Sequence, residues 1–379
     1  MVKVVVAPDK FRGSLTAREV CEAVERGVLR VFPDALVVSV PIADGGEGTV
    51  DAALAAGWRG VYLDSTGANG QPVHAAYAVD DQTALVELAQ ICGLDAIDEA
   101  DRQPLTATTF GLGTVIAHAL DQGVRRLVLA LGGSASTDGG AGMLQALGVG
   151  LYDDQRHHLP PGGAALTALA SVDLAGLHPR VHDVEVIVAC DVDNSLLGRD
   201  GAAAIFGPQK GASPSDVDQL EAGLRRFSAM LEAAGIGPAG GLDQAGVPGA
   251  GAAGGTAYGA MAALRARLQP GIALVLDMVG FNAAVAGADL VVTGEGSIDA
   301  QTLRGKVPVG VRNAAGRHGV PVVAVAGRCS LAAADLAGVG FKAVYALLDI
   351  EPDPRRCMSE AGRLLEELAV QLTREQLSA

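Results

Sequence analysis

The stretch KVVVAPDKFRGSLTARE, residues 3–19, indicates the class of fold. Its β-branched run Lys3–Ala7 predicts a strand, and its last four residues, from Thr16 to Glu19, form a capping box that predicts the start of a helix. Residues 36–49, LVVSVPIADGGEGT, repeat the order of apolar strand, glycine-containing loop and helix start. Because strands that alternate with helices form parallel sheets, we expect functional loops at the carboxyl ends of these strands.

The rest of the chain predicts a second domain inserted into the first. A length of 379 residues exceeds what a single core usually supports, so we expect two domains. From Gly60 the pattern changes to short runs around a turn at residues 69–72, which is typical of an antiparallel meander. From about Asp289 it returns to strand, loop and helix, and it ends in a long amphipathic helix over about residues 355–377. Both chain ends are therefore expected to form one domain.

The charge of the chain limits the partners that it can bind. Its 43 acidic residues exceed its 28 basic residues, which gives a formal net charge of −15. A nucleic-acid backbone or an anionic membrane requires a basic surface, so we expect no nucleic acid and no membrane as partner. Aromatic residues make up 3% of the chain, and few rings are therefore available to stack on bases. An anionic small molecule is compatible with this balance where positive charge is concentrated locally.

The cysteines and the N-terminal sequence predict a cytoplasmic protein. The five cysteines are widely and irregularly spaced, which favours free thiols over disulfides or a zinc site. The apolar run that follows Met1 is too short for a signal peptide. Residues 244–264 are uncharged over the length of a membrane span, but their glycines argue against a stable span.

Five loops carry carboxylates directly after apolar strands, and in all of them except residues 190–194 the carboxylates stand among glycines. Glycines let backbone N–H groups approach a phosphate, whereas the carboxylates would repel it unless a divalent cation or a lysine intervenes. Glycines, carboxylates and a cation together are typical of phosphoryl transfer, although a single loop of this kind could be a plain turn. The loops comprise residues 8–14, 43–48, 132–140, 190–194 and 294–299.

Lysine is rare, and three of the five lysines lie in or beside glycine-rich segments, namely Lys10, Lys210 and Lys306. A compact ammonium beside glycines suits an anion, although chance placement on a polar loop explains any one of them as well. The usual nucleotide motifs are missing from the sequence. Lys306 lacks the glycine pattern of a P-loop, and the G-x-G-x-x-G that starts at Gly249 follows a loop rather than a strand.

The content and order of these loops resemble the glycerate kinase family of bacteria. The resemblance covers practically the whole chain and rests on several long motifs in one order. These motifs are APDKFRGSLTA (7–17), ADGGEGT (43–49), TFGLG (109–113), GGSASTDGGAGMLQALG (132–148), ACDVDNSLLG (189–198), FGPQKGA (206–212) and TGEGSIDAQTLRGKVPVGV (293–311).

The resemblance implies an enzyme, a kinase that uses ATP and Mg2+ to phosphorylate D-glycerate, usually to 2-phosphoglycerate. It also implies an α/β fold with two α/β domains, a discontinuous Rossmann-like parallel-sheet domain and a second domain inserted into it. On this chain we place the Rossmann-like domain at residues 1–60 and 287–379 and the inserted domain at residues 61–286. Phosphoryl transfer is then expected in the cleft between the domains.

Two departures from the family pattern concern its first and third loops. The first loop commonly carries serine and then lysine around its phenylalanine, where this chain has Lys10 and Arg12. The third loop commonly carries Thr-Asn, where this chain has Ser136 and Thr137. Because a guanidinium binds a carboxylate through two hydrogen bonds and an ammonium acts as a point charge, Arg12 bears on which acid is bound.

Residue chemistry assigns expected roles within these loops. Backbone donors and one ammonium are expected to bind the ATP phosphates, from Gly132, Gly133, Ser134, Gly139, Gly140 and Lys210. Polar side chains are expected to bind glycerate, with Arg12 on its carboxylate, from Asp9, Arg12, Ser14 and Asn194. Two carboxylates are expected to hold magnesium, those of Asp193 and Glu295.

Three further residues are expected to act in catalysis, Asp191, Lys306 and Asp44. Asp191 follows an apolar run and can accept the proton of the attacking hydroxyl, while a magnesium ligand or a loop cap are its competing roles. Lys306, like Lys210, can neutralise charge that develops on the transferred group. A role in structuring the loop competes with each of these assignments.

Two other functions are compatible with the sequence. The first is a kinase for another small hydroxyacid, or one that forms 3-phosphoglycerate, on the same scaffold. The second is a sensor of a nucleotide or metabolite without turnover, although the presence of Asp44, Asp191 and Lys306 speaks against it. The expected partners are small molecules, ATP and glycerate, and the chain is expected to be a monomer or a homodimer.

Overall fold

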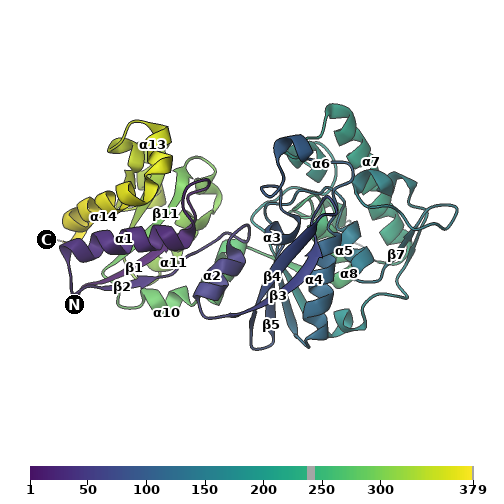
Figure 1. Ribbon diagram of the computed structural model, residues 1–379, viewed down its shortest axis with the longest axis horizontal. Coiled ribbons are helices and arrows are strands. Elements are labelled where there is room, and N and C mark those ends of the chain that lie inside the picture. The colour runs from purple at the N-terminus through teal and green to yellow at the C-terminus, as the bar shows by residue number, and fades with distance from the viewer. Residues whose placement is uncertain (237–243, 378–379) are drawn as a thin grey trace. The chain divides into compact units, whose positions relative to one another are not determined.

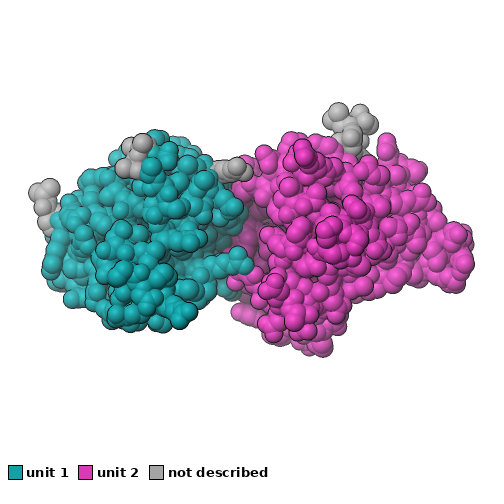
Figure 2. Space-filling view, turned by 90° about the horizontal axis from the view of Figure 1, so that it is seen from above, with its two compact units in different colours: residues 1–44, 51–57, 272–379 teal, residues 45–50, 58–271 magenta. Residues whose placement is uncertain are grey.

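The computed structural model describes residues 1–236 and 244–377 and divides the chain into two compact units. Unit 1 consists of residues 1–44, 51–57 and 272–379, and unit 2 of residues 45–50 and 58–271 (Figure 2). Each unit has its own sheet and its own apolar core. The chain is therefore a two-part α/β protein in which a second part is inserted into a discontinuous first part.

Unit 1 contains a five-stranded parallel sheet built from both ends of the chain, in the order β13-β12-β11-β1-β2. The pairing of β1 with β11 sets Val4 beside Leu290, which confirms that the chain ends share one sheet. Numbered along the chain, these strands have the doubly wound order 2-1-3-4-5, which reverses between β1 and β11. The strands are β1 (Lys3–Pro8), β2 (Leu36–Ser39), β11 (Leu290–Ile298), β12 (Val322–Cys329) and β13 (Ala343–Ala346).

Helices cover both faces of this sheet. On one face α1 packs along α14 over Val4 and Val6, and Figure 1 shows these two helices side by side. On the other face α9, α10 and α11 bury apolar side chains against Val5 and Ala7, because alternate residues of a strand face opposite sides. The helices are α1 (Ala17–Val31), α2 (Thr49–Ala55), α9 (Gly271–Met278), α10 (Phe281–Val285), α11 (Val307–Gly316), α12 (Ala333–Val339), α13 (Pro354–Ser359) and α14 (Ala361–Leu377).

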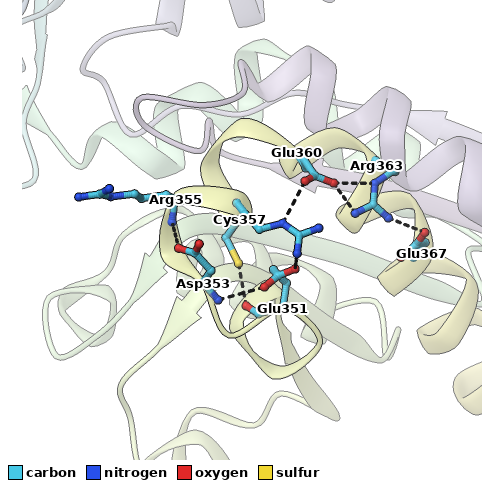
Figure 3. Close-up of polar contacts among 8 residues, drawn as sticks. Glu351, Asp353, Arg355, Cys357, Glu360, Arg363 and Glu367 are labelled. Atoms are coloured by element: carbon cyan, nitrogen blue, oxygen red, sulfur yellow. Dashed lines mark hydrogen bonds and ion pairs between the residues drawn. The ribbon is translucent and has the colours of Figure 1, made fainter.

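The C-terminal segment forms two helices, whereas the sequence pattern predicts one. α13 ends at Ser359 and α14 begins at Ala361. Glu360, which lies between them, accepts hydrogen bonds from Arg356 in α13 and from Arg363 in α14 (Figure 3). The apolar period continues across Glu360, so periodicity alone does not reveal the break.

Unit 2 contains a six-stranded mixed sheet in the order β10-β9-β6-β5-β4-β3. Strands β5, β6, β9 and β10 are parallel, and β3, β4 and β5 form the antiparallel meander that the turn at residues 69–72 predicts. A separate hairpin-like pair is formed by β7 (Gly150–Tyr152) and β8 (Ser171–Asp173). The sheet strands are β3 (Arg59–Thr66), β4 (Pro72–Asp80), β5 (Thr83–Glu87), β6 (Arg126–Ala130), β9 (Glu185–Ala189) and β10 (Arg267–Gln269).

The helices of unit 2 complete a single core, in which α3, α4 and α8 pack on this sheet, α5 packs on α4, and α7 packs on α6. They are α3 (Ala89–Cys92), α4 (Phe110–Asp121), α5 (Ala141–Ala146), α6 (Ala202–Phe206), α7 (Pro214–Ala233) and α8 (Thr256–Leu264). Ser213 and Asp216 form a capping box at the start of α7. Among the helices of residues 1–236 and 244–377, none is long and apolar enough to cross a membrane.

The compact units differ from the predicted domain limits at three places, of which the smallest is that residues 58–60 belong to unit 2. Residues 272–286 belong to unit 1, because apolar residues of α9 and α10 such as Val275 and Phe281 pack in its core. Residues 45–50 belong to unit 2, where this segment bonds to the end of β5. The division into domains at residues 1–60 with 287–379 and at residues 61–286 stays a prediction.

Candidate active site

In unit 1 the sheet places three predicted site residues after neighbouring parallel strands. Asp9 follows β1, Asp44 follows β2, and Glu295 lies near the carboxyl end of β11. The N–H of Asp9 donates to the carbonyl of Gly294 on β11 at 2.8 Å, which joins two of these positions. They lie where the strand order reverses, the usual ligand position in a doubly wound sheet.

These carboxyl groups oppose each other's ionisation. Burial, the neighbouring Asp44 and then Glu295 raise the pKa of Asp9 to about 8, although its Oδ1 accepts the N–H of Lys10 at 2.7 Å. Burial raises the pKa of Glu295 as well, while the hydroxyl of Thr302 and the charge of Lys306 act in the other direction. A cation bound beside these groups would favour their ionised forms.

Lys306 and Thr302 lie on the same side of unit 1 as Glu295. Lys306 is the residue before the first turn of α11, and its charge acts on Glu295. The fully buried hydroxyl of Thr302 donates to Oε1 of Glu295 and accepts the N–H of Asp299. Thr302 therefore fixes the direction of a carboxylate that the sequence predicts to hold magnesium.

The first loop of unit 1 carries two predicted glycerate-binding residues. Arg12 is exposed and its neighbour Phe11 is buried in the core. The hydroxyl of Ser14 donates to the carbonyl of Phe11 at 3.0 Å and so closes a turn within the loop. The structure thus brings Arg12 and Ser14 into one turn directly after Asp9.

In unit 2 the candidate loops lie at the shared carboxyl edge of four parallel strands. The register of β6 and β9 ends with Ala130 opposite Ala189, so Gly132 and Asp191 lie two residues beyond a matched pair. The N–H of Gly132 donates to the carbonyl of Gly45 at 3.2 Å. A Cβ on Gly132 would lie 2.6 Å from the Cα of Gly46, so no side chain fits there. The glycine loops of two distant motifs thus pack backbone against backbone.

The predicted phosphate loop divides into an exposed and a buried part. Gly132 and Gly133 are exposed, whereas Ser134, Gly139 and Gly140 are buried. The N–H of Gly139 donates to the carbonyl of Gly254, and that of Gly140 to the carboxylate of Asp138. In the part of the chain that the structure describes, the N–H groups of Gly133 and Ser134 have no protein acceptor. These two amides are the donors that a phosphate could use.

Lys210 is inside the protein and not at the mouth of this loop. Its side chain is 2% exposed, and its ammonium donates to the carbonyl of Ser136. Burial lowers the pKa of Lys210 to about 7, while the charge of Asp138 acts in the opposite direction. The lysine therefore contacts the phosphate loop from its inner side.

The loop after β9 contains the remaining predicted residues. Oδ1 of Asp191 accepts the N–H of Gly271, the first residue of α9, at 2.8 Å. Asp193 is exposed, and the side-chain amide of Asn194 donates to the carbonyl of Asp200 at 2.9 Å. Asp191 thus has a capping contact of its own, and Asn194 structures its loop.

The structure contains no protein-only metal cluster within residues 1–236 and 244–377, since no group of three or more His, Cys, Asp or Glu side chains is placed to hold an ion. Glu295 belongs to unit 1 and Asp193 to unit 2. Mg2+ commonly uses one or two carboxylates and completes its shell with water and phosphate oxygens. The donor chemistry of Glu295 and Asp193 fits that mode of binding.

Sequence reasoning missed two buried carboxylates, Glu87 beside these loops and Asp138 within one of them. Glu87, at the end of β5, accepts the N–H groups of Gly48 and Val50 at 3.1 and 2.9 Å. Asp138 accepts N–H groups from the segments that begin α4 and α5. An acid inside the apolar run of β5 was a readable signal, because a buried charge must have partners. Asp138 stands among glycines, where acids are common in turns, and gave no comparable signal.

Comparison with known proteins shows the family of the chain. The sequence model described as the glycerate kinase family matches residues 4–376. The chain belongs to the glycerate kinase family. It is 46% identical to the glycerate kinase of Bacillus subtilis (strain 168), over 87% of this chain and 86% of that protein. It is 42% identical to the glycerate 2-kinase of Escherichia coli (strain K12), over 92% and 91% of the two chains.

A solved structure shares the fold across the whole family member. The crystal structure of a Salmonella typhimurium LT2 protein assigned as a glycerate kinase 2 superposes with a TM-score of 0.83 at 40% identity. The match covers 99% of this chain and 98% of that one. The predicted family and α/β fold are therefore confirmed, and the chain is a kinase.

Proposed function

We propose that this family member transfers the γ-phosphoryl group of ATP to D-glycerate, with Mg2+, and forms 2-phosphoglycerate. The observation that carries the proposal is the 42% identity, over 92% of the chain, to the Escherichia coli protein named glycerate 2-kinase. The glycine-and-carboxylate loops at the carboxyl edges of both sheets support it. A cleft between domains as the place of reaction belongs to the same proposal.

The acceptor is bound by the first loop of unit 1. The exposed guanidinium of Arg12 pairs with the glycerate carboxylate, for which a planar fork of donors is suited. Asp9 directly precedes this loop and is a second proposed contact of the acceptor, and burial raises its pKa to about 8 in the protein without metal. Ser14 keeps the turn closed, and Asn194 in unit 2 remains a proposed glycerate contact.

The triphosphate is bound by the loop after β6. The N–H groups of Gly133 and Ser134 donate to phosphate oxygens, since they have no acceptor in the described part of the protein. Gly132, Gly139 and Gly140 shape this loop through their internal bonds. Lys210 contacts the inner side of this loop, where its ammonium donates to the carbonyl of Ser136.

Magnesium is held by Glu295 and Asp193 in this proposal, together with phosphate oxygens and water. When bound, Mg2+ would offset the negative charge of the phosphates beside the carboxylates of the site. Thr302 keeps the carboxylate of Glu295 in one direction for this purpose. Lys306 and Asp44 are proposed to act beside it, with the ammonium of Lys306 stabilising charge on the transferred group.

Proton transfer is assigned to Asp191. As the glycerate hydroxyl oxygen bonds to the γ-phosphorus, the bond from that phosphorus to the ADP oxygen breaks. The hydroxyl proton passes to the carboxylate of Asp191 late in this step. The capping bond to Gly271 fixes the carboxylate in the meantime.

A coupled assay of ADP release tests the proposal. Purified protein is incubated with ATP and magnesium and with each of D-glycerate, L-glycerate, lactate and tartronate, and once without an acid. We expect turnover with D-glycerate well above the other acids and loss of turnover after chelation of the metal. Preference for another acid would show that this acid, and not D-glycerate, is the substrate. Absence of turnover with every acid would contradict the proposal.

Phosphorus NMR of the product tests the position of transfer. The 2-phosphate lies on a secondary carbon and the 3-phosphate on a primary carbon, so their signals differ in coupling to neighbouring protons. We expect the 2-phosphoglycerate pattern. A 3-phosphoglycerate pattern would keep the kinase assignment and overturn the position.

A further inference from the structure

Two buried groups of opposite charge lie behind the predicted phosphate loop. Lys210 is 2% exposed and Asp138 is fully buried. Lys210 ends the short turn of helix at residues 208–210, and Asp138 belongs to the loop itself. Burial lowers the pKa of Lys210, whereas the charge of Asp138 raises it, so the two charges attract each other. Neither side chain is placed at the surface, and both must act on a ligand through the loop.

Asp138 holds the loop by its amide groups. Its Oδ1 accepts the N–H of Gly140 at 3.1 Å, and its Oδ2 accepts the N–H of Gly142 at 3.2 Å. Oδ2 also accepts both the N–H and the hydroxyl of Thr109, at 2.8 and 2.9 Å. A single buried carboxylate therefore binds the starts of α4 and α5 to one point.

Thr109 extends this connection. Its hydroxyl donates to Asp138 and accepts the N–H of Met143 at 2.9 Å. Thr109 is fully buried, so its hydroxyl serves only these internal partners. It belongs to the TFGLG motif, for which the predicted functions give no role.

Lys210 holds the loop by a carbonyl group. Its ammonium donates to the carbonyl of Ser136, which lies 74 residues away in sequence. The N–H of Ser136 donates to the hydroxyl of Ser134 at 3.2 Å, and the same hydroxyl is within 3.2 Å of the Ser136 carbonyl. Lys210 is thus connected through Ser136 to Ser134, whose N–H group is one of the two that could bind a phosphate.

An ammonium is a costly choice for this position. Removing a lysine from water costs free energy that buried partners offset only in part, and apolar side chains in place of both Lys210 and Asp138 would avoid the cost of the two charges. A charge that stabilises little by itself needs another reason to be there. A positive charge directly behind amides that face an anion supplies one, because it strengthens the same attraction.

We propose that Lys210 and Asp138 are positioning residues of the nucleotide site, which fix the Gly132–Gly140 loop from behind so that the amides of Gly133 and Ser134 meet the triphosphate. Lys210 acts through Ser136, and Asp138 acts through Gly140, Gly142 and Thr109. This inference rests on the proposed function of the loop as the phosphate site. It replaces direct contact of Lys210 with ATP by an indirect role.

The test compares Lys210→Met, which keeps length and removes charge, with Lys210→Arg, which keeps charge. The exposed Lys342→Met is the matched control for the loss of one lysine. We expect KM for ATP to rise about 10- to 100-fold in Lys210→Met, with KM for D-glycerate within about twofold of wild type. The melting temperature of Lys210→Met should fall, because the substitution leaves the buried carboxylate of Asp138 without its positive neighbour. Lys342→Met should match wild type in every respect.

A second pair of variants tests the Asp138 side independently. Thr109→Ser keeps the hydroxyl that bonds Asp138 and Met143, whereas Thr109→Val keeps the shape alone. We expect Thr109→Val to raise KM for ATP and Thr109→Ser to restore it largely. This pair of variants tests the inference even if Lys210→Arg does not fold because arginine is too large for the buried position.

The outcomes separate this inference from the proposed function. Absence of glycerate phosphorylation by the wild-type protein would contradict the proposed function, and magnesium-ATP titration calorimetry would then compare the same variants without an acceptor. An unchanged affinity for ATP in both Lys210→Met and Thr109→Val would overturn the inference. A fall in melting temperature with an unchanged KM for ATP would make both residues purely structural and overturn it too.

Discussion

Asp9 is a carboxyl group whose surroundings oppose its ionisation. Its pKa is raised from 3.8 to about 8 by burial and by Asp44. In the unfolded chain the group loses its proton near pH 4, and in the folded protein it keeps the proton up to about pH 8. The folded state thus binds more protons between these values, so the free energy of unfolding falls as pH rises from about 4 to 8.

Asp9→Asn should remove this dependence. The amide oxygen of asparagine still accepts the N–H of Lys10, and no proton is held at any pH. We expect the variant to gain stability over wild type by roughly 1–4 kcal/mol between pH 5 and pH 8. Urea unfolding of both proteins at the two pH values measures the difference. Unfolding midpoints that stay parallel across this range would contradict the prediction.

Asp191 combines a capping contact with the proposed role as base. Asp191→Asn keeps an oxygen that accepts the N–H of Gly271 and removes charge and basicity. We expect kcat to fall on the order of 10²–10⁴-fold, with KM for ATP and the melting temperature near wild type. Steady-state kinetics at several magnesium concentrations measure this.

Two other outcomes for Asp191→Asn would remove the role of base. Activity that recovers with excess magnesium would make Asp191 a metal ligand. Near-normal kcat at ordinary magnesium would leave it a cap for α9, and Asp191→Ala should then lower the melting temperature alone.

At the level of single residues, the sequence predicted location better than orientation. Asp9 lies directly after β1 and Asp44 in the loop that follows β2, because a run of apolar residues followed by a polar loop marks a strand end. The direction of the Lys210 ammonium depends on Ser136, which is distant in sequence. Glycines beside a lysine are compatible with an exposed ammonium and with a buried one. Only tertiary packing distinguishes the two cases.

Among the elements, α1 and α14 depend on one glycine for their close packing. A Cβ on Gly27 would lie 2.5 Å from the Cβ of Ala369 and 2.5 Å from the carbonyl oxygen of Glu366. Gly27→Ala should therefore destabilise unit 1 by about 1–3 kcal/mol, because the helices must move apart. Chemical unfolding of the purified variant measures the loss.

Gly316→Ala is the matched control for Gly27→Ala. Gly316 ends α11, also in unit 1, and a Cβ there has no neighbour within 4 Å. Alanine is the better helix former by about 1 kcal/mol, so this variant should be as stable as wild type or more stable. Equal destabilisation by both substitutions would show that packing between α1 and α14 is not the cause.

Elements with local signals were predictable, and elements fixed by distant contacts were not. The capping box of Thr16 and Glu19 is confirmed at the start of α1, because all its bonds lie within four residues. The break at Glu360 depends on side chains of two helices and escapes a periodicity argument. The short α5 begins where Asp138 accepts the N–H groups of Thr109 and Gly142. These residues belong to two segments of the chain, so no single stretch of sequence reveals the arrangement.

For the whole molecule, the discontinuity of unit 1 has a consequence for function. The chain passes between the units after Asp44, Val50, Gly57 and Gly271. The first and last of these points adjoin predicted catalytic groups, since Asp44 is one of them and Gly271 bonds to Asp191. These two points of passage therefore lie in the backbone next to residues that are proposed to act in catalysis.

The proposed reaction predicts that the protein becomes more compact when both substrates are bound. The proposed acceptor group Arg12 belongs to unit 1 and the proposed phosphate donors Gly133 and Ser134 to unit 2, so transfer requires both units to contribute to one reaction. Water competes with glycerate for the γ-phosphorus, and a site that excludes water only with both ligands present avoids hydrolysis. Small-angle X-ray scattering should show a smaller radius of gyration with a non-hydrolysable ATP analogue, magnesium and D-glycerate together than with either ligand alone.

The same comparison in Arg12→Ala, which loses the proposed carboxylate partner, should show the ATP-analogue effect without the further decrease. An unchanged scattering profile with both ligands, at concentrations where calorimetry shows that they bind, would mean that phosphoryl transfer proceeds without closure.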